Sequence, residues 1–399
     1  MSDTMGSFQP FAVSSSSGNL DMANPSGSVL KELLLEQINV LLIGLPLGIA
    51  SGWLQWGDIP TFWLNFIALV PLAKLLGDAT DQLAEGLQND TVGGLLNATF
   101  GNAVEMIITI QAVKSGFLEV VKNSLIGSIL SNLLMVLGMS FFCGGVGRQS
   151  QQFKNLGPMV NITMLFLAVM AFSLPTIFHD SGAVAQQDIL RVSRINACLV
   201  LVGYTAYLIF QLLTHVDLFQ EDNDDEAPED DAPAEEERMS VGCSTALLLV
   251  TTVLVAISSQ YLVHSIDGLV NQWHFPQAFV GVVLLPIIGN ACEHASAVRL
   301  AIQDKPVVSI MIAVGSSTQI ALLVMPFAVL AGWCTDRPLD LNLGTAGISI
   351  LFLSVTLVFT IVSTSTSNWL EGFFLMLAYL LVGILYWYTP NTPVPTVNR

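Results

Sequence analysis

Residues 101–105 read Gly-Asn-Ala-Val-Glu, and residues 289–293 read Gly-Asn-Ala-Cys-Glu. Each motif places one carboxylate, Glu105 or Glu293, inside a long apolar segment, which costs about 2.5 kcal/mol or more at the centre of a membrane. The flanking sequence matches at the same offset of 188 residues over about 40 residues, which is the signature of an internal repeat. Because this cost occurs twice, at matching positions of two similar motifs, we expect both carboxylates to be functional.

The composition indicates a polytopic membrane protein. The 399 residues are 53% hydrophobic and only 11% charged, whereas soluble domains carry about 25% charged residues. Most of the net charge of −18 comes from one stretch, residues 221–237, which holds eleven acids. The chain has no basic patch, which argues against nucleic acid as a partner. Its five cysteines lack the spacing of a metal site, and no cofactor is predicted.

Eleven apolar segments are long enough to cross a membrane as helices. They lie near 35–56, 60–82, 91–113, 118–144, 157–178, 192–216, 242–265, 277–302, 306–333, 344–363 and 367–388. The offset pairs the second to sixth segments with the seventh to eleventh. Because five is an odd number, the second unit enters the membrane from the opposite side. The predicted fold is therefore all-α, with one extra N-terminal helix and two inverted five-helix repeats, an arrangement that places a binding site near the midplane.

The domain boundaries follow from these segments. We expect a disordered tail at 1–30, the extra helix at 31–58, the first repeat at 59–216, an acidic linker at 217–241, the second repeat at 242–390 and a C-terminal tail at 391–399. The linker either acts as a spacer or concentrates cations near a pore mouth. Lys and Arg are shared equally between the two faces, so they predict no orientation.

The chemistry of the two motifs favours a hard cation. Asn102 and Glu105 are three residues apart and share a helix face, as do Asn290 and Glu293. Carboxylate and amide oxygens suit Ca²⁺ and, less exclusively, Mn²⁺. The scarcity of His and the lack of paired Cys argue against a site for Zn²⁺ or Cu⁺.

Five further polar residues lie near the motifs in the sequence. Glu85 and Asp267 each end the segment before a motif, so each either lines an ion pathway or is an interfacial acid in water. His294 follows Glu293 and either shares a proton with it or makes a structural hydrogen bond. Ser131 and Gln319 occupy equivalent repeat positions, where they either complete the polar lining or pack helices.

Electrostatics predicts how such a site works. Two ionised carboxylates that face one cavity repel each other, and burial disfavours each charge further, so the empty pair prefers to be protonated. A divalent cation displaces those protons and holds both carboxylates ionised. Competition between Ca²⁺ and H⁺ for the same groups is the requirement of an antiporter. Two protons for one Ca²⁺ give an electroneutral cycle, and a third proton makes it electrogenic.

Three stretches carry a family resemblance: GNAVEMIITIQAVKSG, SLIGSILSNLLMVLG and PIIGNACEHASAV. They resemble the paired repeats of the Ca²⁺/H⁺ exchangers (CAX) of the cation/Ca²⁺ exchanger superfamily, vacuolar calcium/proton exchanger type. The resemblance implies that Glu105 and Glu293 bind Ca²⁺ and protons alternately, with help from Asn102 and Asn290. The remaining roles it implies are Glu85 and Asp267 in the cation pathway and Ser131 and Gln319 in the polar lining. His294 is expected in the proton pathway from its position beside Glu293 alone.

The resemblance also implies a location. Its members keep the N-terminus and the acidic linker in the cytosol and move Ca²⁺ into an acidic vacuole, while bacterial members sit in the cell membrane. The expected partners are Ca²⁺, protons and membrane lipid, and a homo-oligomer is one alternative for the assembly. The competing functions are a Na⁺-coupled Ca²⁺ exchanger, a cation channel and an intramembrane hydrolase. The last is disfavoured because the chain lacks a nucleophile motif, so no enzyme is predicted.

Overall fold

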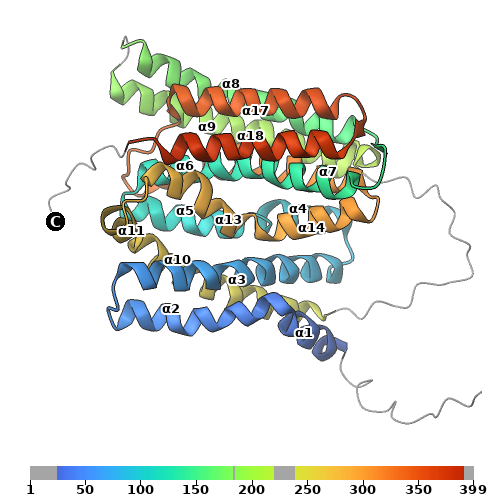
Figure 1. The fold of residues 1–399 in the computed structure, drawn as a ribbon, viewed down its shortest axis with the longest axis horizontal. Helices are drawn as coiled ribbons and strands as arrows, with labels where there is room; N and C mark the ends of the chain where they lie inside the picture. The colour runs from blue at the N-terminus through green and yellow to red at the C-terminus, as the bar shows by residue number, and fades with distance from the viewer. Residues whose placement is uncertain (1–24, 183–184, 220–238, 391–399) are drawn as a thin grey trace, which may run out of the picture.

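The computed structural model describes residues 25–182, 185–219 and 239–390, which are helical apart from loops and two short strands (Figure 1). The elements of the first half are α1 (Pro25–Leu35), η1 (Gln37–Ile43), α2 (Gly44–Trp53), α3 (Asp58–Gly86), α4 (Asp90–Phe100), α5 (Ala103–Ser115), α6 (Leu118–Leu130), η2 (Ser131–Val136), α7 (Leu137–Gly145), β1 (Gln151–Gln152), α8 (Leu156–Asp180), α9 (Gln186–Ile209), η3 (Phe210–Thr214) and η4 (Val216–Leu218).

The elements of the second half are α10 (Val241–His264), α11 (Ile266–Gln272), α12 (Gln277–Phe279), η5 (Val280–Leu284), α13 (Leu285–Gly289), α14 (Ala291–Ile302), α15 (Pro306–Gln319), η6 (Ile320–Val324), α16 (Met325–Cys334), α17 (Gly344–Val362), β2 (Thr366–Ser367) and α18 (Trp369–Trp387). The short elements η2, η3, η5 and η6 are π-helical turns within longer helices. Such turns occur often at functional sites because they re-aim side chains.

Within the described ranges, eight helices are long and apolar enough to cross a membrane, and two bent helix pairs raise the number to ten. The bent pairs are Ser26–Leu35 with Gln37–Trp53, at 72°, and Gln277–Gly289 with Ala291–Ile302, at 61°. The predicted segment 91–113 is not among these ten, and it forms the separate helices α4 and α5. The predicted segments are therefore helical, but 91–113 and 277–302 are each broken inside, and 35–56 has a bend at its start.

The predicted tails and linker lie mostly outside the described residues. Those residues are 1–24, 183–184, 220–238 and 391–399. The predicted disordered tail ends too late, at residue 30, because helix α1 already begins at Pro25.

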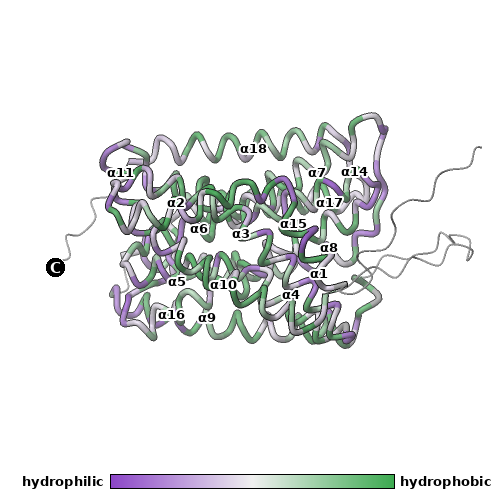
Figure 2. Tube along the Cα trace, turned by 90° about the horizontal axis from the view of Figure 1, so that it is seen from below, coloured by the Kyte–Doolittle hydropathy of each residue, from purple (hydrophilic) through white to green (hydrophobic). Residues whose placement is uncertain are grey.

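The helices form layers with their long axes roughly parallel (Figure 1). The helices α2, α3 and α10 pack together on one side, α8, α9 and α17 lie on the other, and the motif helices α5, α13 and α14 lie between them. Hydrophilic residues gather at the two ends of the bundle, and hydrophobic residues occupy the length between (Figure 2). This distribution is that of a bundle embedded in a membrane.

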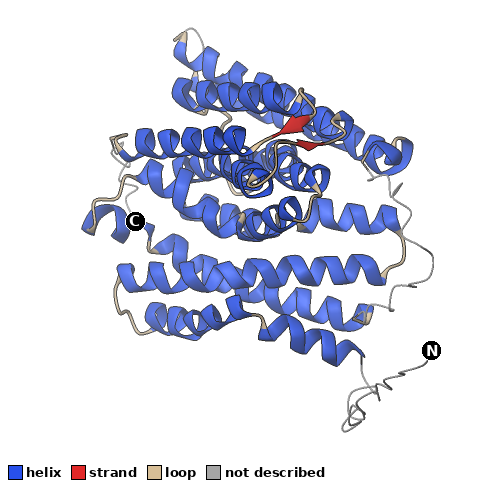
Figure 3. Cartoon of the chain, turned by 45° about the vertical axis from the view of Figure 1, so that its right-hand side comes forward, coloured by secondary structure: helices blue, strands red, loops and turns tan. Residues whose placement is uncertain are grey.

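The two ends of the bundle define two faces. The N-terminal face carries the start of α1, the loops 87–89 and 303–305, and the antiparallel strands β1 and β2, which join the two repeats (Figure 3). The C-terminal face carries the loops 54–57 and 335–343 and the end of α18. The first repeat begins with α3 at the C-terminal face, whereas the second begins with α10 at the N-terminal face. The two repeats are therefore inverted, as the odd number of segments predicts.

The extra span α2 is fixed to the first helices of both repeats by a buried amide. Asn65 on α3 donates from Nδ2 to the carbonyl of Gly48 at 3.1 Å and accepts from Ser258 of α10 at 2.9 Å. A side chain at Gly48 would collide with Asn65, since a Cβ would lie 2.8 Å from its Oδ1. The helices α2, α3 and α10 thus form one packed unit.

A buried ion pair holds the loop 335–343 at the C-terminal face. Lys122 of α6 lies 3.3 Å from Asp340 of this loop, and both residues are at least nine-tenths buried. Gln186 donates to the second oxygen of Asp340 at 3.2 Å. Because the pair joins α6 of the first repeat to a loop of the second, it fastens the two repeats together at this face.

Candidate cation site

The two sequence motifs lie at two helix breaks in the interior of the bundle. Asn102 separates α4 from α5, and Asn290 separates α13 from α14, each with non-helical backbone angles. Glycine before each asparagine loosens the helix there. At the second break the backbone of Gly289 lies directly against the side chain of Glu105, because a Cβ on this glycine would overlap the carboxylate. The inverted repeats therefore bring the two motifs into contact.

The two glutamates occupy one charged microenvironment. Glu105 is buried, and its charge acts on the carboxylate of Glu293. One oxygen of each, Oε1 of Glu105 and Oε2 of Glu293, is buried without a hydrogen-bond partner among the described residues. An unpartnered buried oxygen is costly unless a ligand or proton fills its place. This pair is therefore the strongest candidate for a cation site.

The asparagines of the motifs each hydrogen-bond a residue of the other repeat. Asn102 donates from Nδ2 to Oε1 of Gln319 at 2.6 Å. Asn290 donates from Nδ2 to the carbonyl of Ser128 at 3.1 Å, and its Oδ1 is buried without a partner. Both asparagines are fully buried. Each amide thus spans the two repeats, and the free Oδ1 of Asn290 is a further oxygen available to a cation.

Two residues that sequence reasoning missed extend this network. Asn132 on η2 donates from Nδ2 to Oγ of Ser316 at 3.0 Å, and its own Oδ1 is buried without a partner. Ser316 in turn donates to Oδ1 of Asn102 at 3.5 Å or to the carboxylate of Glu293. A signal for Ser316 was present, because it is the repeat counterpart of Ser128. Asn132 stands out only as an amide in an apolar run.

The other predicted site residues have different positions. His294 uses Nδ1 to donate to the backbone carbonyl of Asn290 at 2.6 Å, which is the structural hydrogen bond considered as an alternative. Ser131 is buried beside Asn132, and no hydrogen bond among the described residues joins it to either motif glutamate. Gln319 lies in the network through its bond to Asn102.

A cavity of about 350 Å³ leads away from the glutamates. Its lining includes Glu293 and Ser296 of α14, Asn97 of α4, and Thr80 and Asp81 of α3. These residues run from the motif toward the ends of α3 and α14 at the N-terminal face. The candidate site is therefore approached from this face.

The predicted acids Glu85 and Asp267 are exposed, and they lie at opposite faces. Glu85 stands one turn beyond Asp81, at the end of α3 on the N-terminal face. Asp267 lies on α11 at the C-terminal face. Inverted repeats place equivalent residues at opposite faces, so the two acids do not share a site.

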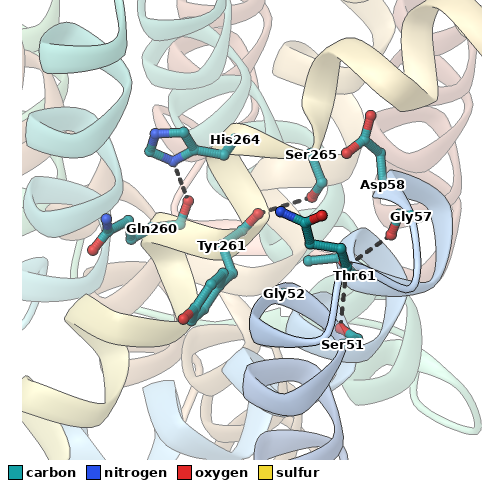
Figure 4. Close-up of a pocket in the computed structure, with 10 residues that line it drawn as sticks. Ser51, Gly52, Gly57, Asp58, Thr61, Gln260, Tyr261, His264 and Ser265 are labelled. Atoms are coloured by element: carbon teal, nitrogen blue, oxygen red, sulfur yellow. Dashed lines mark hydrogen bonds between the residues drawn. The ribbon is translucent and has the colours of Figure 1, made fainter.

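A second cavity, of about 420 Å³, lies at the C-terminal face between α2, α3 and α10 (Figure 4). Its lining includes Asp58, Thr61, Gln260 and His264, and His264 uses Nδ1 to donate to the carbonyl of Gln260 at 2.7 Å. Asp58 packs against Gly268, the residue after Asp267. This cavity is separate from the motif glutamates, which do not line it.

No cluster of three or more His, Cys, Asp or Glu side chains in the described part of the chain is arranged to hold a metal. The candidate cation site instead offers two carboxylates together with amide and hydroxyl oxygens. Oxygen donors of mixed charge suit a hard divalent cation that must also leave.

Both halves of the chain match one known protein family. The family model described as sodium/calcium exchanger protein matches residues 58–213 and 243–388. These two ranges coincide with the two inverted repeats.

Two curated relatives cover nearly the whole chain. Vacuolar cation/proton exchanger 3 of Oryza sativa subsp. japonica is 41% identical over 359 residues, which cover 88% of this chain and 85% of the relative. The Ca²⁺/H⁺ antiporter of Synechocystis sp. is 38% identical over 362 residues, which cover 88% of this chain and 97% of the relative.

The solved structure of native YfkE is also similar. It superposes with a TM-score of 0.75 at 31% identity and covers 88% of this chain and 100% of that chain. The likeness therefore extends over both repeats in three dimensions as well as in sequence.

Proposed function

The chain belongs to the sodium/calcium exchanger protein family, and we propose that it is a Ca²⁺/H⁺ antiporter in which Glu105 and Glu293 bind Ca²⁺ and protons alternately. Members of this family are transporters, and the relatives described above are named as cation/proton exchangers and Ca²⁺/H⁺ antiporters. One observation supports the assignment of the two glutamates most strongly. Their carboxylates come from opposite repeats, influence each other electrostatically, and each has a buried oxygen without a partner.

The exchange of Ca²⁺ for protons follows from the electrostatic cost of two ionised glutamates with no ligand bound. Two carboxylates about 4 Å apart repel by about 4 kcal/mol at an effective dielectric constant of 20, and desolvation costs several kcal/mol more for each. Two protons or one divalent cation remove this cost equally well. The empty, ionised pair is the high-energy state, so the carrier should change sides only when loaded. This restriction couples the two fluxes.

Neutral oxygens complete the coordination of the cation. Ca²⁺ takes six to eight oxygen ligands. The free Oδ1 of Asn290 belongs to the same motif as Glu293, and the free Oδ1 of Asn132 belongs to the side chain that Ser316 joins to the motifs. Asn102 contributes by holding Gln319 in the same network. Mn²⁺ accepts the same donor types. The cation and the protons are the transported substrates in this proposal.

Access alternates between the two faces. Residues that line the cavity, Asn97 and Ser296, have the repeat counterparts Leu285 and Ile108 at the offset of 188 residues. Both counterparts are buried, with 2% and 5% exposure. This difference supports a proposal in which this conformation opens toward the N-terminal face and is closed toward the C-terminal face. Moving α3 and α10 against the motif helices would exchange these two states.

The proton gradient supplies the driving force. Each proton contributes about 1.4 kcal/mol per unit of pH difference. An integral membrane protein of this kind in an acidic organelle would accumulate Ca²⁺ there, with the N-terminal face in the cytosol. The vacuolar names of several relatives support this location.

Ca²⁺ uptake into proteoliposomes with an acidic interior tests the proposal. The native protein should load Ca²⁺ only while the pH difference lasts, and Glu105→Gln and Glu293→Gln should each abolish uptake while they still fold. The amide keeps the size of the side chain and removes its titratable charge. Normal uptake by either variant would contradict the glutamate mechanism. Uptake that depends on Na⁺ would instead identify Na⁺-coupled exchange, and downhill flux without proton movement would identify a channel.

A further inference from the structure

An arginine lines the cavity that leads to the candidate cation site. Arg299 lies on α14, six residues after Glu293, and lines the same cavity as Glu293 and Asp81. Among the described residues no hydrogen bond or direct ion pair holds its guanidinium, and its charge acts on Asp78 through space. A cation in a cation pathway repels the substrate, and its presence calls for a physical reason.

The charges around the cavity supply this reason. The carboxylate of Asp78, one turn before Asp81 on α3, lies 2.7 Å from Nζ of Lys74 and is also under the influence of Arg299. Asp81 hydrogen-bonds Asn97 and is influenced by the charges of Asp78, Glu85 and Lys74. Asp78 and Asp81 are therefore two anions outside the glutamate pair.

The resident cations offset the outer acids only in part. Lys74 is shared between two carboxylates, because it lies 2.6 Å from Glu36 as well as 2.7 Å from Asp78. Arg299 is therefore the cation left to offset Asp81, with which it lines the cavity. The glutamate pair contributes two more negative charges, which one divalent cation or two protons neutralise. Without Arg299, the outer pair would carry an excess negative charge and would attract a further cation.

The repeat counterpart of Arg299 is neutral. The offset of 188 residues places Gln111 of α5 at the equivalent position. The fold therefore accommodates an uncharged glutamine of similar length at this point of the helix. Of the two equivalent positions, only 299, on the side of the N-terminal face, carries a positive charge.

We propose that Arg299 is a specificity-determining residue, whose fixed charge limits the cavity to one divalent cation at Glu105 and Glu293 by keeping a second cation from Asp78 and Asp81. This inference rests on the proposed function. It assigns to Arg299 an electrostatic role without contact to the transported ion. Because the charge is exposed to the water of the cavity, its effect should weaken as ionic strength rises.

The test measures Ca²⁺ binding at equilibrium to the full-length protein in detergent, and Ca²⁺ uptake by the same variants in proteoliposomes. The variant Arg299→Gln introduces the residue type found at the equivalent position of the first repeat, Gln111. Arg299→Lys is the matched control that keeps the charge. We expect one bound Ca²⁺ for the native protein and for R299K, and two for R299Q. In uptake, R299Q should lower the KM for Ca²⁺ at least about threefold at low salt, and this difference should shrink in high salt.

A further variant keeps the inference testable if R299Q folds poorly. Asp81→Asn removes one outer anion, so it should raise the KM for Ca²⁺ at low salt. Where R299Q does fold, D81N combined with R299Q should return the number of bound Ca²⁺ to one. One bound Ca²⁺ in R299Q, or equal changes in R299Q and R299K, would overturn the role of the charge. Uptake that is independent of the pH difference would contradict the proposed function, but the binding count would still decide the role of Arg299.

Discussion

The substitution Gly289→Ala isolates the contact between the two motifs. A Cβ at this position would lie 2.7 Å from Cδ of Glu105, whereas ordinary van der Waals contact begins at 3.4 Å. Cores of this density leave little free space, and Oε1 lies nearer still, so the carboxylate must retreat by at least about 0.7 Å. Because Ca²⁺ coordinates oxygens within about 2.3–2.6 Å, such a shift removes one charged ligand from its optimal place.

The expected loss is large enough to measure. Weakening one charged contact costs about 2–3 kcal/mol, which corresponds to roughly a 30- to 150-fold rise in the apparent KM for Ca²⁺. The assay is the initial rate of Ca²⁺ uptake into acidic-interior proteoliposomes at a series of Ca²⁺ concentrations. Melting temperature in detergent reports folding independently.

Gly315→Ala is the matched control. This glycine also lies in a helix near the site, but the nearest atom to its added Cβ is Nδ2 of Asn161, at 3.9 Å. The control should keep the native KM and gain up to about 1 kcal/mol in stability, since alanine favours helix. A native KM in G289A, with both variants folded, would refute the placement of Glu105 against the second motif.

Two further substitutions test the hydrogen bonds of Ser316 and the buried ion pair between Lys122 and Asp340. Ser316→Ala removes a hydroxyl that joins Asn132 to the motifs. The loss of about 1–1.5 kcal/mol of binding free energy should raise the KM for Ca²⁺ about 5- to 12-fold, with an unchanged melting temperature. An unchanged KM would exclude Ser316 from the site. Lys122→Met leaves Asp340 buried without its cation and should lower the free energy of unfolding by about 3–5 kcal/mol. The double variant with Asp340→Leu should recover part of this loss, measured as melting temperature. Equal melting temperatures for K122M and the native protein would show that the pair contributes nothing to stability.

Much of the architecture could be predicted from the sequence because it depends on properties that are local in the chain. Segment length and hydropathy predict the helices. The constant offset between the two GNA-x-Glu motifs predicts the repeat, and the odd number of segments in each unit predicts its inversion. The positions of Glu105 and Glu293 in apolar segments mark them as candidates before any contact is known. What hydropathy does not predict is where helices break, since it averages over residues such as Gly101 and Asn102.

The tertiary structure decided which residues meet. A repeat offset identifies equivalent positions, and inverted symmetry places equivalents such as Glu85 and Asp267 at opposite faces. Contacts such as Asn132 with Ser316 join residues far apart in the sequence, and only the packing of the two repeats brings them together. The sequence by itself thus determined the helices, the repeats and the two buried carboxylates, because an apolar solvent constrains each segment separately. The neighbours of those carboxylates, and the face from which they are reached, depend on helix packing across the whole bundle.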